Sequence, residues 1–163
     1  PLLARGKLQL VVLGSGATSY EKRLSALQQR FPRQVCFYRG FSDPLAHMIE
    51  AGSDMFLMPS RYEPCGLNQL YSLRYGTVPV VRQTGGLADS VQQFDTRSLR
   101  GTGFTFEHFD ARGLYWALSR ALSIWPHRRA WRQLQLNGMQ QDFSWHKQVQ
   151  TYEALYHRLQ APQ

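Results

Sequence analysis

Short apolar runs alternate with amphipathic stretches through the first two-thirds of the chain. Five runs, most of them followed by Gly or Pro, have the length and composition of strands: residues 7–13, 35–38, 54–58, 78–81 and 104–106. Helices are predicted between them, one capped by Ser19 and stopped at Pro32, one from about Pro44, and one over residues 66–75. This alternation predicts β-α units, and therefore an α/β fold with a mainly parallel sheet flanked by helices.

The composition of these runs predicts where a ligand would lie. Apolar strands without polar alternation suit burial on both faces, as helices on each side of a sheet require. In such sheets, ligands bind in the crevice beyond the carboxyl ends of the strands. Unusual loops follow the predicted strand ends at residues 14–16, 40–41, 60–66 and 82–86. We expect the functional residues in these loops.

The last third of the chain is predicted to be helical. Two segments have apolar residues at helical spacing. The first stripe is Leu114, Ala117, Leu118, Ala121 and Leu122, and the second is Trp131, Leu134 and Met139. Ser144 is placed to cap a final helix with the stripe Val149, Tyr152, Leu155, Tyr156 and Leu159. This last stripe is broader than one small sheet needs. We therefore expect Tyr152 and Tyr156 to be partly exposed or covered by a neighbouring surface; the alternative is packing on the domain's own core.

The length of 163 residues suits one compact domain, residues 1–163. Residues 1–6 read as the tail of a helix that no strand precedes, so we expect the chain to be cut from a longer protein. Cys36 and Cys65 fit neither a metal-ligand spacing nor a disulfide framework, which favours the cytoplasm. No apolar run approaches the length of a transmembrane helix and no signal peptide is recognisable, so no membrane partner is expected.

The charge is strongly basic, with 19 Lys and Arg against 11 Asp and Glu and a net charge of +8. Such a balance is compatible with a polyanionic partner, but the basic residues are scattered and no nucleic-acid recognition motif accompanies them. Nucleic-acid binding is therefore not expected. The same bias could serve a small anion such as a nucleotide diphosphate, or only a solvated surface.

The segment PSRYEPCGLNQLY, residues 59–71, has the residue types of a sugar-phosphate site. Glu63 lies in a loop after a predicted strand, where its carboxylate can accept hydrogen bonds from a polyol. Gly66 is expected to open the next helix, whose first N–H groups and positive dipole end attract phosphate. Taken alone, the pattern is equally compatible with an ordinary capped helix.

The whole string closely resembles a motif of bacterial glycogen synthases and plant starch synthases. The strings YGTVPVVR at 75–82, TGGLADSV at 84–91 and DFSW at 142–145 also resemble that family. The resemblance implies the second, donor-binding Rossmann-like domain of a two-domain GT-B enzyme. Such enzymes transfer glucose from ADP-glucose, or UDP-glucose in some members, to the non-reducing end of an α-1,4-glucan, with retention and without a metal. It also implies an N-terminal acceptor domain that is absent here.

The site residues follow from the same resemblance. Glu63 matches the glutamate beside the donor glucose and is expected to stabilise positive charge at the anomeric carbon. The helix-start positions are expected to contact sugar, phosphate and ribose through their backbone: Cys65, Gly66, Leu67 and Asn68. Asn68 replaces an expected threonine, which puts a side-chain contact there in doubt. Phe41 matches an aromatic position that packs on the nucleotide base.

Tyr71 stands eight residues after Glu63, where many related transferases carry a second glutamate that binds ribose. Tyrosine at this position is typical of the starch and glycogen synthase branch, and Tyr71 is therefore included in the donor site. It also argues against Glu63 being half of a hydrolase carboxylate pair. Thr84, Gly85 and Gly86 are expected to shape the cleft floor and to bring N–H groups near a phosphate.

Several other residues receive structural interpretations. The family's phosphate-binding Arg and Lys would precede residue 1, and Arg61 and Arg82 are expected in salt bridges. The five histidines show no metal spacing, so no metal site is predicted. The four tryptophans fall in helical stretches, where packing is expected of them. Cys65 has no neighbouring base and is interpreted as a wall residue.

A glucosyltransferase has two alternatives, of which the first stays open and the second is disfavoured. A non-catalytic module that binds nucleotide or glycan could keep the same fold, although the intact string Glu63-Pro64-Cys65-Gly66 favours the enzyme. A phosphorylase-like enzyme would need a lysine for pyridoxal phosphate, and the three lysines, Lys7, Lys22 and Lys147, lie in no predicted site loop.

Overall fold

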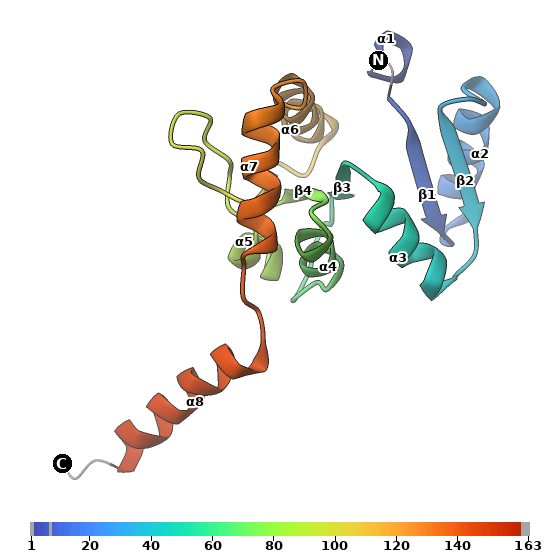
Figure 1. The fold of residues 1–163 in the computed structure, drawn as a ribbon. Coiled ribbons are helices and arrows are strands. Elements are labelled where there is room, and N and C mark those ends of the chain that lie inside the picture. Colours follow the sequence, from blue (N-terminus) through green and yellow to red (C-terminus); the bar gives the residue numbers. More distant parts are fainter. Residues whose placement is uncertain (1, 7, 161–163) are drawn as a thin grey trace. The chain divides into compact units, whose positions relative to one another are not determined.

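The computed structural model describes residues 2–6 and 8–160, and it divides the chain into two compact units, Pro1–Ile49 and Glu50–Gln163. Both units contain parallel strands accompanied by helices, as the α/β prediction requires (Figure 1). The prediction of a single donor-binding domain over residues 1–163 stays a prediction.

The first unit is built on a two-stranded parallel sheet. Its elements are α1 (Leu2–Arg5), β1 (Leu10–Gly14), α2 (Thr18–Arg30), β2 (Val35–Arg39) and most of α3 (Asp43–Gly52). β1 pairs with β2 from Leu10–Val35 to Gly14–Arg39. α2 packs against β2, and because one helix cannot cover both faces, most of β2 remains exposed. The prediction of strands buried on both faces is therefore wrong for β2.

The predicted cap of α2 is also wrong. The helix begins at Thr18 and its N-cap residue is Ala17, with no side-chain cap. Ser19 thus lies inside the first turn. The turn before the helix is held instead by Glu21, which is buried and accepts a hydrogen bond from the Gly16 N–H at 3.0 Å. Glu21 also forms an ion pair with Arg39 at 2.9 Å, which ties the turn to β2.

The second unit contains a three-stranded parallel sheet in the order β3-β4-β5. Its strands are β3 (Met55–Met58), β4 (Val78–Arg82) and β5 (Phe104–Phe106), and its helices are α4 (Asn68–Tyr75), α5 (Gly86–Ser90), α6 (Ala111–Ile124), α7 (Arg128–Met139) and α8 (Trp145–Gln160). β4 lies in the middle, paired with Met55–Met58 on one side and with β5 on the other. The buried-strand prediction is confirmed for β5 and for all of β4 except Arg82, whereas β3 is only partly buried.

The core of this unit gathers under α6 and α7. Phe104 is fully buried, and its ring lies 6.4 Å from both Phe94 and Trp131, edge-on to the first and stacked on the second. Ala117 and Ala121 of the predicted stripe are fully buried against the sheet, so the packing of α6 is confirmed. Trp131 is likewise a core residue, as the sequence predicted.

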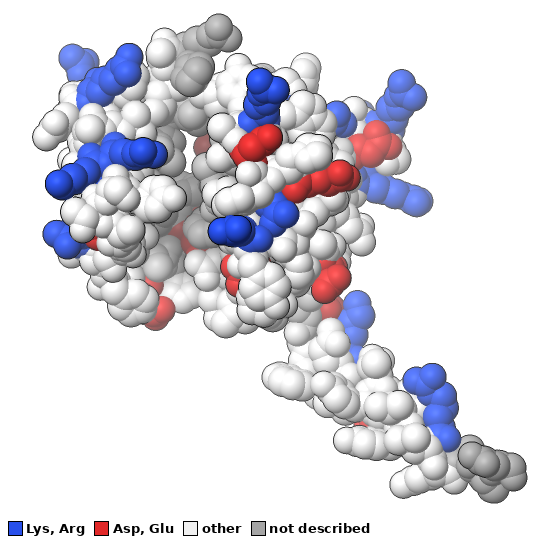
Figure 2. Space-filling model, turned by 180° about the vertical axis from the view of Figure 1, so that it is seen from behind, with Lys and Arg blue, Asp and Glu red and all other residues white. Residues whose placement is uncertain are grey.

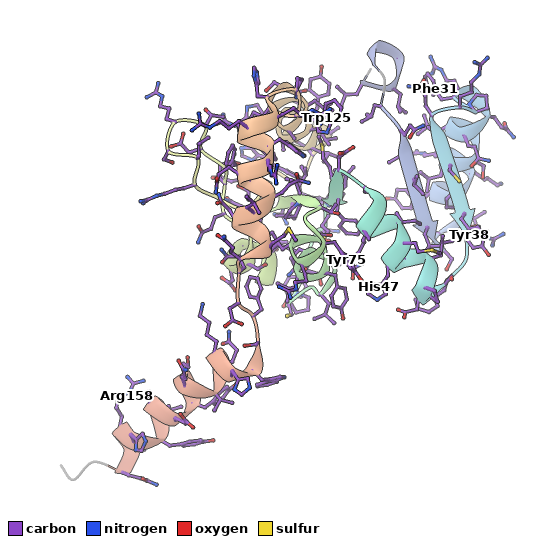
Figure 3. The ribbon with its side chains drawn as sticks, in the orientation of Figure 1. Phe31, Tyr38, His47, Tyr75, Trp125 and Arg158 are labelled. Atoms are coloured by element: carbon purple, nitrogen blue, oxygen red, sulfur yellow. The ribbon has the colours of Figure 1, made fainter. Side chains whose placement is uncertain are left out.

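The final helix, α8, differs from the others because all of its residues are exposed. Tyr152 and Tyr156 are 53% and 59% exposed, so the prediction of partial exposure is confirmed. Figure 3 shows the side chains of α8, with Arg158 labelled near its end, projecting from the helix without a covering element. The helix follows Asp142, whose pKa is held below its ordinary value by hydrogen bonds from Ser144.

Candidate donor-sugar site

Glu63 lies in the loop that connects the carboxyl end of β3 to α4. The residue is half-buried, and Ser60 Oγ donates a hydrogen bond to its Oε2 at 3.3 Å. The loop thus presents a carboxylate with one oxygen oriented by the protein. A carboxylate placed in this way can accept hydrogen bonds from a sugar or stabilise a cationic centre.

Arg82, at the end of β4, holds the first part of this loop. Its Nη1 donates to the carbonyl oxygens of Arg61 at 2.7 Å and Ser60 at 3.4 Å, and its Nε donates to Glu107 O at 3.1 Å. Its guanidinium also lies 5.5 Å from the ring centre of Phe109. Among the residues that the structure describes, neither Arg82 nor Arg61 forms the expected salt bridge. In Arg82, backbone carbonyls take up the Nε and Nη1 donors instead.

Gly85 and Gly86 hold the second part of the loop by close backbone contact. Gly86 N–H donates to the carbonyl oxygen of Glu63 at 3.2 Å. A Cβ at Gly86 would overlap the carbonyl oxygen of Cys65 and lie 2.6 Å from its Cα. A Cβ at Gly85, whose φ is 46°, would overlap the carbonyl oxygen of Glu63. Both positions therefore require glycine, because the loop bearing Glu63 rests directly on them.

This contact changes the interpretation of Thr84, Gly85 and Gly86. The sequence suggested that their N–H groups approach a phosphate, but the Gly86 N–H is engaged by Glu63. The binding role predicted for the three residues stays a prediction. What the structure adds is a supporting role, in which this turn fixes the backbone on either side of Pro64.

The helix start after Glu63 is open. α4 begins at Asn68, two residues later than predicted, because Gly66 has a φ of 74° and lies outside the helix. Leu67 is the N-cap residue and supplies no side-chain cap, and the first turn contains no acidic residue. Cys65, Leu67 and Asn68 are exposed. An N-terminus of this kind is suited to an anion such as phosphate.

Two further predicted residues, Tyr71 and Phe41, belong to other segments of the chain. Tyr71 is 40% exposed and lines a groove of about 350 Å³ beside α4, together with Arg74 and Phe143 among others. Phe41 belongs to the first unit, where it follows β2 and is 88% exposed. An aromatic ring so exposed is available for stacking on a base.

Sequence analysis missed a buried residue that holds the end of the loop. Gln69 is 1% exposed, and its Nε2 donates to Cys65 O at 2.9 Å, Gly66 O at 3.1 Å and Ser90 Oγ at 3.2 Å. The only signal in the sequence was its position three residues after Gly66. Ser60 and Arg82 were likewise not recognised as supports of Glu63.

Other kinds of site find little support in the described residues. No group of three or more His, Cys, Asp or Glu side chains there could hold a metal ion. No described helix has the length and apolar character needed to cross a bilayer. Figure 2 shows Lys and Arg side chains standing apart over the visible face, with no continuous basic patch.

Comparison with known proteins bears on this geometry. Residues 2–135 match the family described as glycosyl transferases group 1. The chain belongs to this family. The match contains both the Glu63 loop and the Gly85–Gly86 turn, so the geometry described above is that of a group 1 transferase domain.

Relatives with higher sequence identity include glycogen and starch synthases. A glycogen synthase of Anaeromyxobacter sp. (strain Fw109-5) is 53% identical over 99% of this chain and 34% of its own length. The catalytic domain of starch synthase IV from Arabidopsis thaliana, solved with ADP and acarbose, is 36% identical with a TM-score of 0.80, over 92% of this chain and 32% of that one. The sucrose-phosphate synthase of Thermosynechococcus elongatus shares the fold. It is 23% identical, with a TM-score of 0.68, over 96% of this chain and 40% of that one.

These relatives confirm the Rossmann-like α/β fold and the recognition of the glycogen and starch synthase family. The chain spans about a third of the length of the curated relatives that it matches. The group 1 transferase domain described here is therefore similar to one part of those proteins.

Proposed function

We propose that this chain is the donor-binding half of a glycogen or starch synthase. The enzyme would transfer glucose from ADP-glucose, or alternatively UDP-glucose, to the non-reducing end of an α-1,4-glucan with retention of configuration. The observation that carries the proposal is the carboxylate of Glu63, which accepts a hydrogen bond from Ser60 in the loop that leads into an uncapped helix. The backbone of the same residue is fixed by the Gly86 N–H, which donates to the Glu63 carbonyl oxygen.

The chemistry of glucosyl transfer suits this arrangement. Breaking the bond between the anomeric carbon and the phosphate leaves positive charge on the sugar ring and negative charge on the diphosphate. Glu63 would stabilise the first charge, and the N-terminus of α4 would stabilise the second. Both groups are fixed before the reaction, so little reorganisation is needed when the charges develop.

The partners in the proposal follow from the relatives. The starch synthase structure contains ADP and acarbose, which supports a nucleotide sugar and a glucan as ligands of the related site. Further acceptor contacts would come from an N-terminal domain, since the chain spans a third of its relatives. The proposal includes no metal or other cofactor beyond the donor, no nucleic acid and no membrane. It places the enzyme in the cytoplasm, which the two free cysteines, Cys36 and Cys65, favour.

Incorporation of radiolabelled glucose into glycogen tests this function. We expect the full-length protein to extend glycogen with ADP-glucose or UDP-glucose. The isolated 163-residue chain should bind ADP weakly and transfer no glucose, because a shared cleft excludes water only when both walls are present. Full-length protein that binds ADP but transfers glucose from neither donor would favour the non-catalytic module. Transfer by the isolated chain would contradict the need for a second domain.

The exposed face of α8 gives a second expectation about the full-length protein. In two-domain transferases of the type this chain resembles, the last helix commonly packs on the first domain. We therefore expect Tyr152 and Tyr156 to be nitrated readily in the isolated chain and protected in the full-length protein. Peptide mass spectrometry would measure both, with Tyr20, which is 67% exposed, as the exposed reference in the isolated chain. Equal nitration of α8 in the two proteins would contradict the covered face.

A further inference from the structure

Gln69 is a buried polar residue in the first turn of α4. Its Nε2 reaches three acceptors, which are the carbonyl oxygens of Cys65 and Gly66 and the hydroxyl of Ser90. Because the two carbonyls can only accept, the NH₂ group of the amide must be the part that faces them. A leucine of similar volume would fill the same space and offer none of these bonds.

These bonds belong to a closed network that joins two loops. Ser90 Oγ donates to the carbonyl oxygen of Gly86, and Gly86 N–H donates to the carbonyl oxygen of Glu63 at 3.2 Å. Gln69 then connects Ser90 back to Cys65 and Gly66. The backbone from Glu63 to Gly66 is therefore held from the side of the Gly85–Gly86 turn and from the side of α4.

Glutamine at this position leaves one of its own polar atoms unsatisfied, which an apolar residue of the same size would not do. Gln69 Oε1 is buried and has no hydrogen-bond partner among the described residues. An unsatisfied buried acceptor is unfavourable, because it has lost its hydrogen bonds to water. The amide is also matched to Gly66, where a Cβ would overlap Oε1 and lie 2.9 Å from Nε2. Both features indicate that the donor side of the amide is what this position requires.

We propose that Gln69 is the positioning residue of the donor site. Through Cys65, Gly66 and Ser90 it sets the path of the loop, and thereby the place of the Glu63 carboxylate relative to the N-terminus of α4. Because Gln69 is 1% exposed, it would act without touching sugar or phosphate. The inference rests on the proposed glucosyl transfer and adds to it the residue that aligns the two charged ends of the site.

Gln69→Met in the full-length enzyme tests the proposal, because methionine keeps the length and volume of the side chain and loses the donors. We expect kcat for glucan extension to fall about tenfold, since a small misplacement of a catalytic group is costly. Ser90→Ala removes the link between Gln69 and Gly86 but keeps the bonds from Gln69 to Cys65 and Gly66, and it should lower kcat less and in the same direction. Ser72→Ala is the matched control, as Ser72 is fully buried on the same helix and its Oγ has no described partner. It should keep the wild-type kcat.

A double-mutant cycle separates positioning from general stability. If Gln69 acts through Glu63, then Gln69→Met should cost about tenfold in the wild type and almost nothing in a Glu63→Gln background. An equal loss in both backgrounds, or unchanged kcat in both Gln69→Met and Ser90→Ala, would overturn the positioning role. If Gln69→Met does not fold, Ser90→Ala in the same two backgrounds decides. Absence of transfer by the wild type and Ser72→Ala would instead overturn the proposed function.

Discussion

Replacing Glu63 by glutamine in the full-length enzyme is expected to lower kcat by about 10²-fold, or about 3 kcal/mol. The amide keeps the shape and can still accept the hydrogen bond from Ser60. It loses the negative charge, whose stabilising effect is needed only when positive charge develops on the sugar. The KM for the donor should therefore change much less than kcat.

Initial rates of glucose incorporation at varied donor concentration would measure both constants. Glu107→Gln is a suitable control, because Glu107 is an exposed carboxylate of the same unit that contributes its backbone carbonyl to Arg82. This control should retain the wild-type kcat. A Glu63→Gln enzyme with unchanged kcat would reduce Glu63 to a structural residue and remove the main support for the mechanism.

Alanine at Gly86 is expected to have an effect of similar size for a different reason. The added Cβ would overlap the carbonyl oxygen of Cys65, so the loop must move away from the Gly85–Gly86 turn. Such overpacking costs about 1–3 kcal/mol of stability. Displacement of the loop by even 1 Å would also move Glu63, and misplacement of that order can lower kcat by about 10²-fold.

Thermal unfolding and steady-state kinetics of the full-length protein would measure the two effects of Gly86→Ala. Gly52→Ala is the matched control, since a Cβ at the end of α3 would meet no atom within 4 Å. We expect this control to keep its activity and its Tm. A Gly86→Ala variant as active as Gly52→Ala would mean that the turn does not support the Glu63 loop.

The order of elements could be predicted because hydrophobic periodicity is a local property of the sequence. All five strands and the helices of the last third were found, and residues 104–106 were placed with the observed bounds. Helix starts were less predictable. Ser19 has the right residue type for a cap, but α2 begins at Thr18 with Ala17 as its N-cap residue, so Ser19 lies within the first turn. Gly66 was placed inside α4 because its positive φ leaves no trace in periodicity.

The support of the site could not be predicted for a related reason. Glu63 was recognised from its motif, whereas the turn at Gly85–Gly86 contacts it only through the fold. Gln69 appeared as an ordinary helix residue, because its contacts reach Ser90, 21 residues away along the chain. Contacts of this length depend on how β3, β4 and α4 pack, which a pattern of apolar residues does not specify.

Hydrogen–deuterium exchange of the full-length protein with and without ADP would test the location of the donor site most directly. The account predicts that ADP slows exchange in peptides covering residues 63–71, which include the Glu63 loop and the start of α4. Peptides covering residues 95–101, an exposed turn held by Asp95 and Asn137, should exchange at the same rate in both states. Binding of ADP without any protection of residues 63–71 would contradict the assignment of this loop as the donor site.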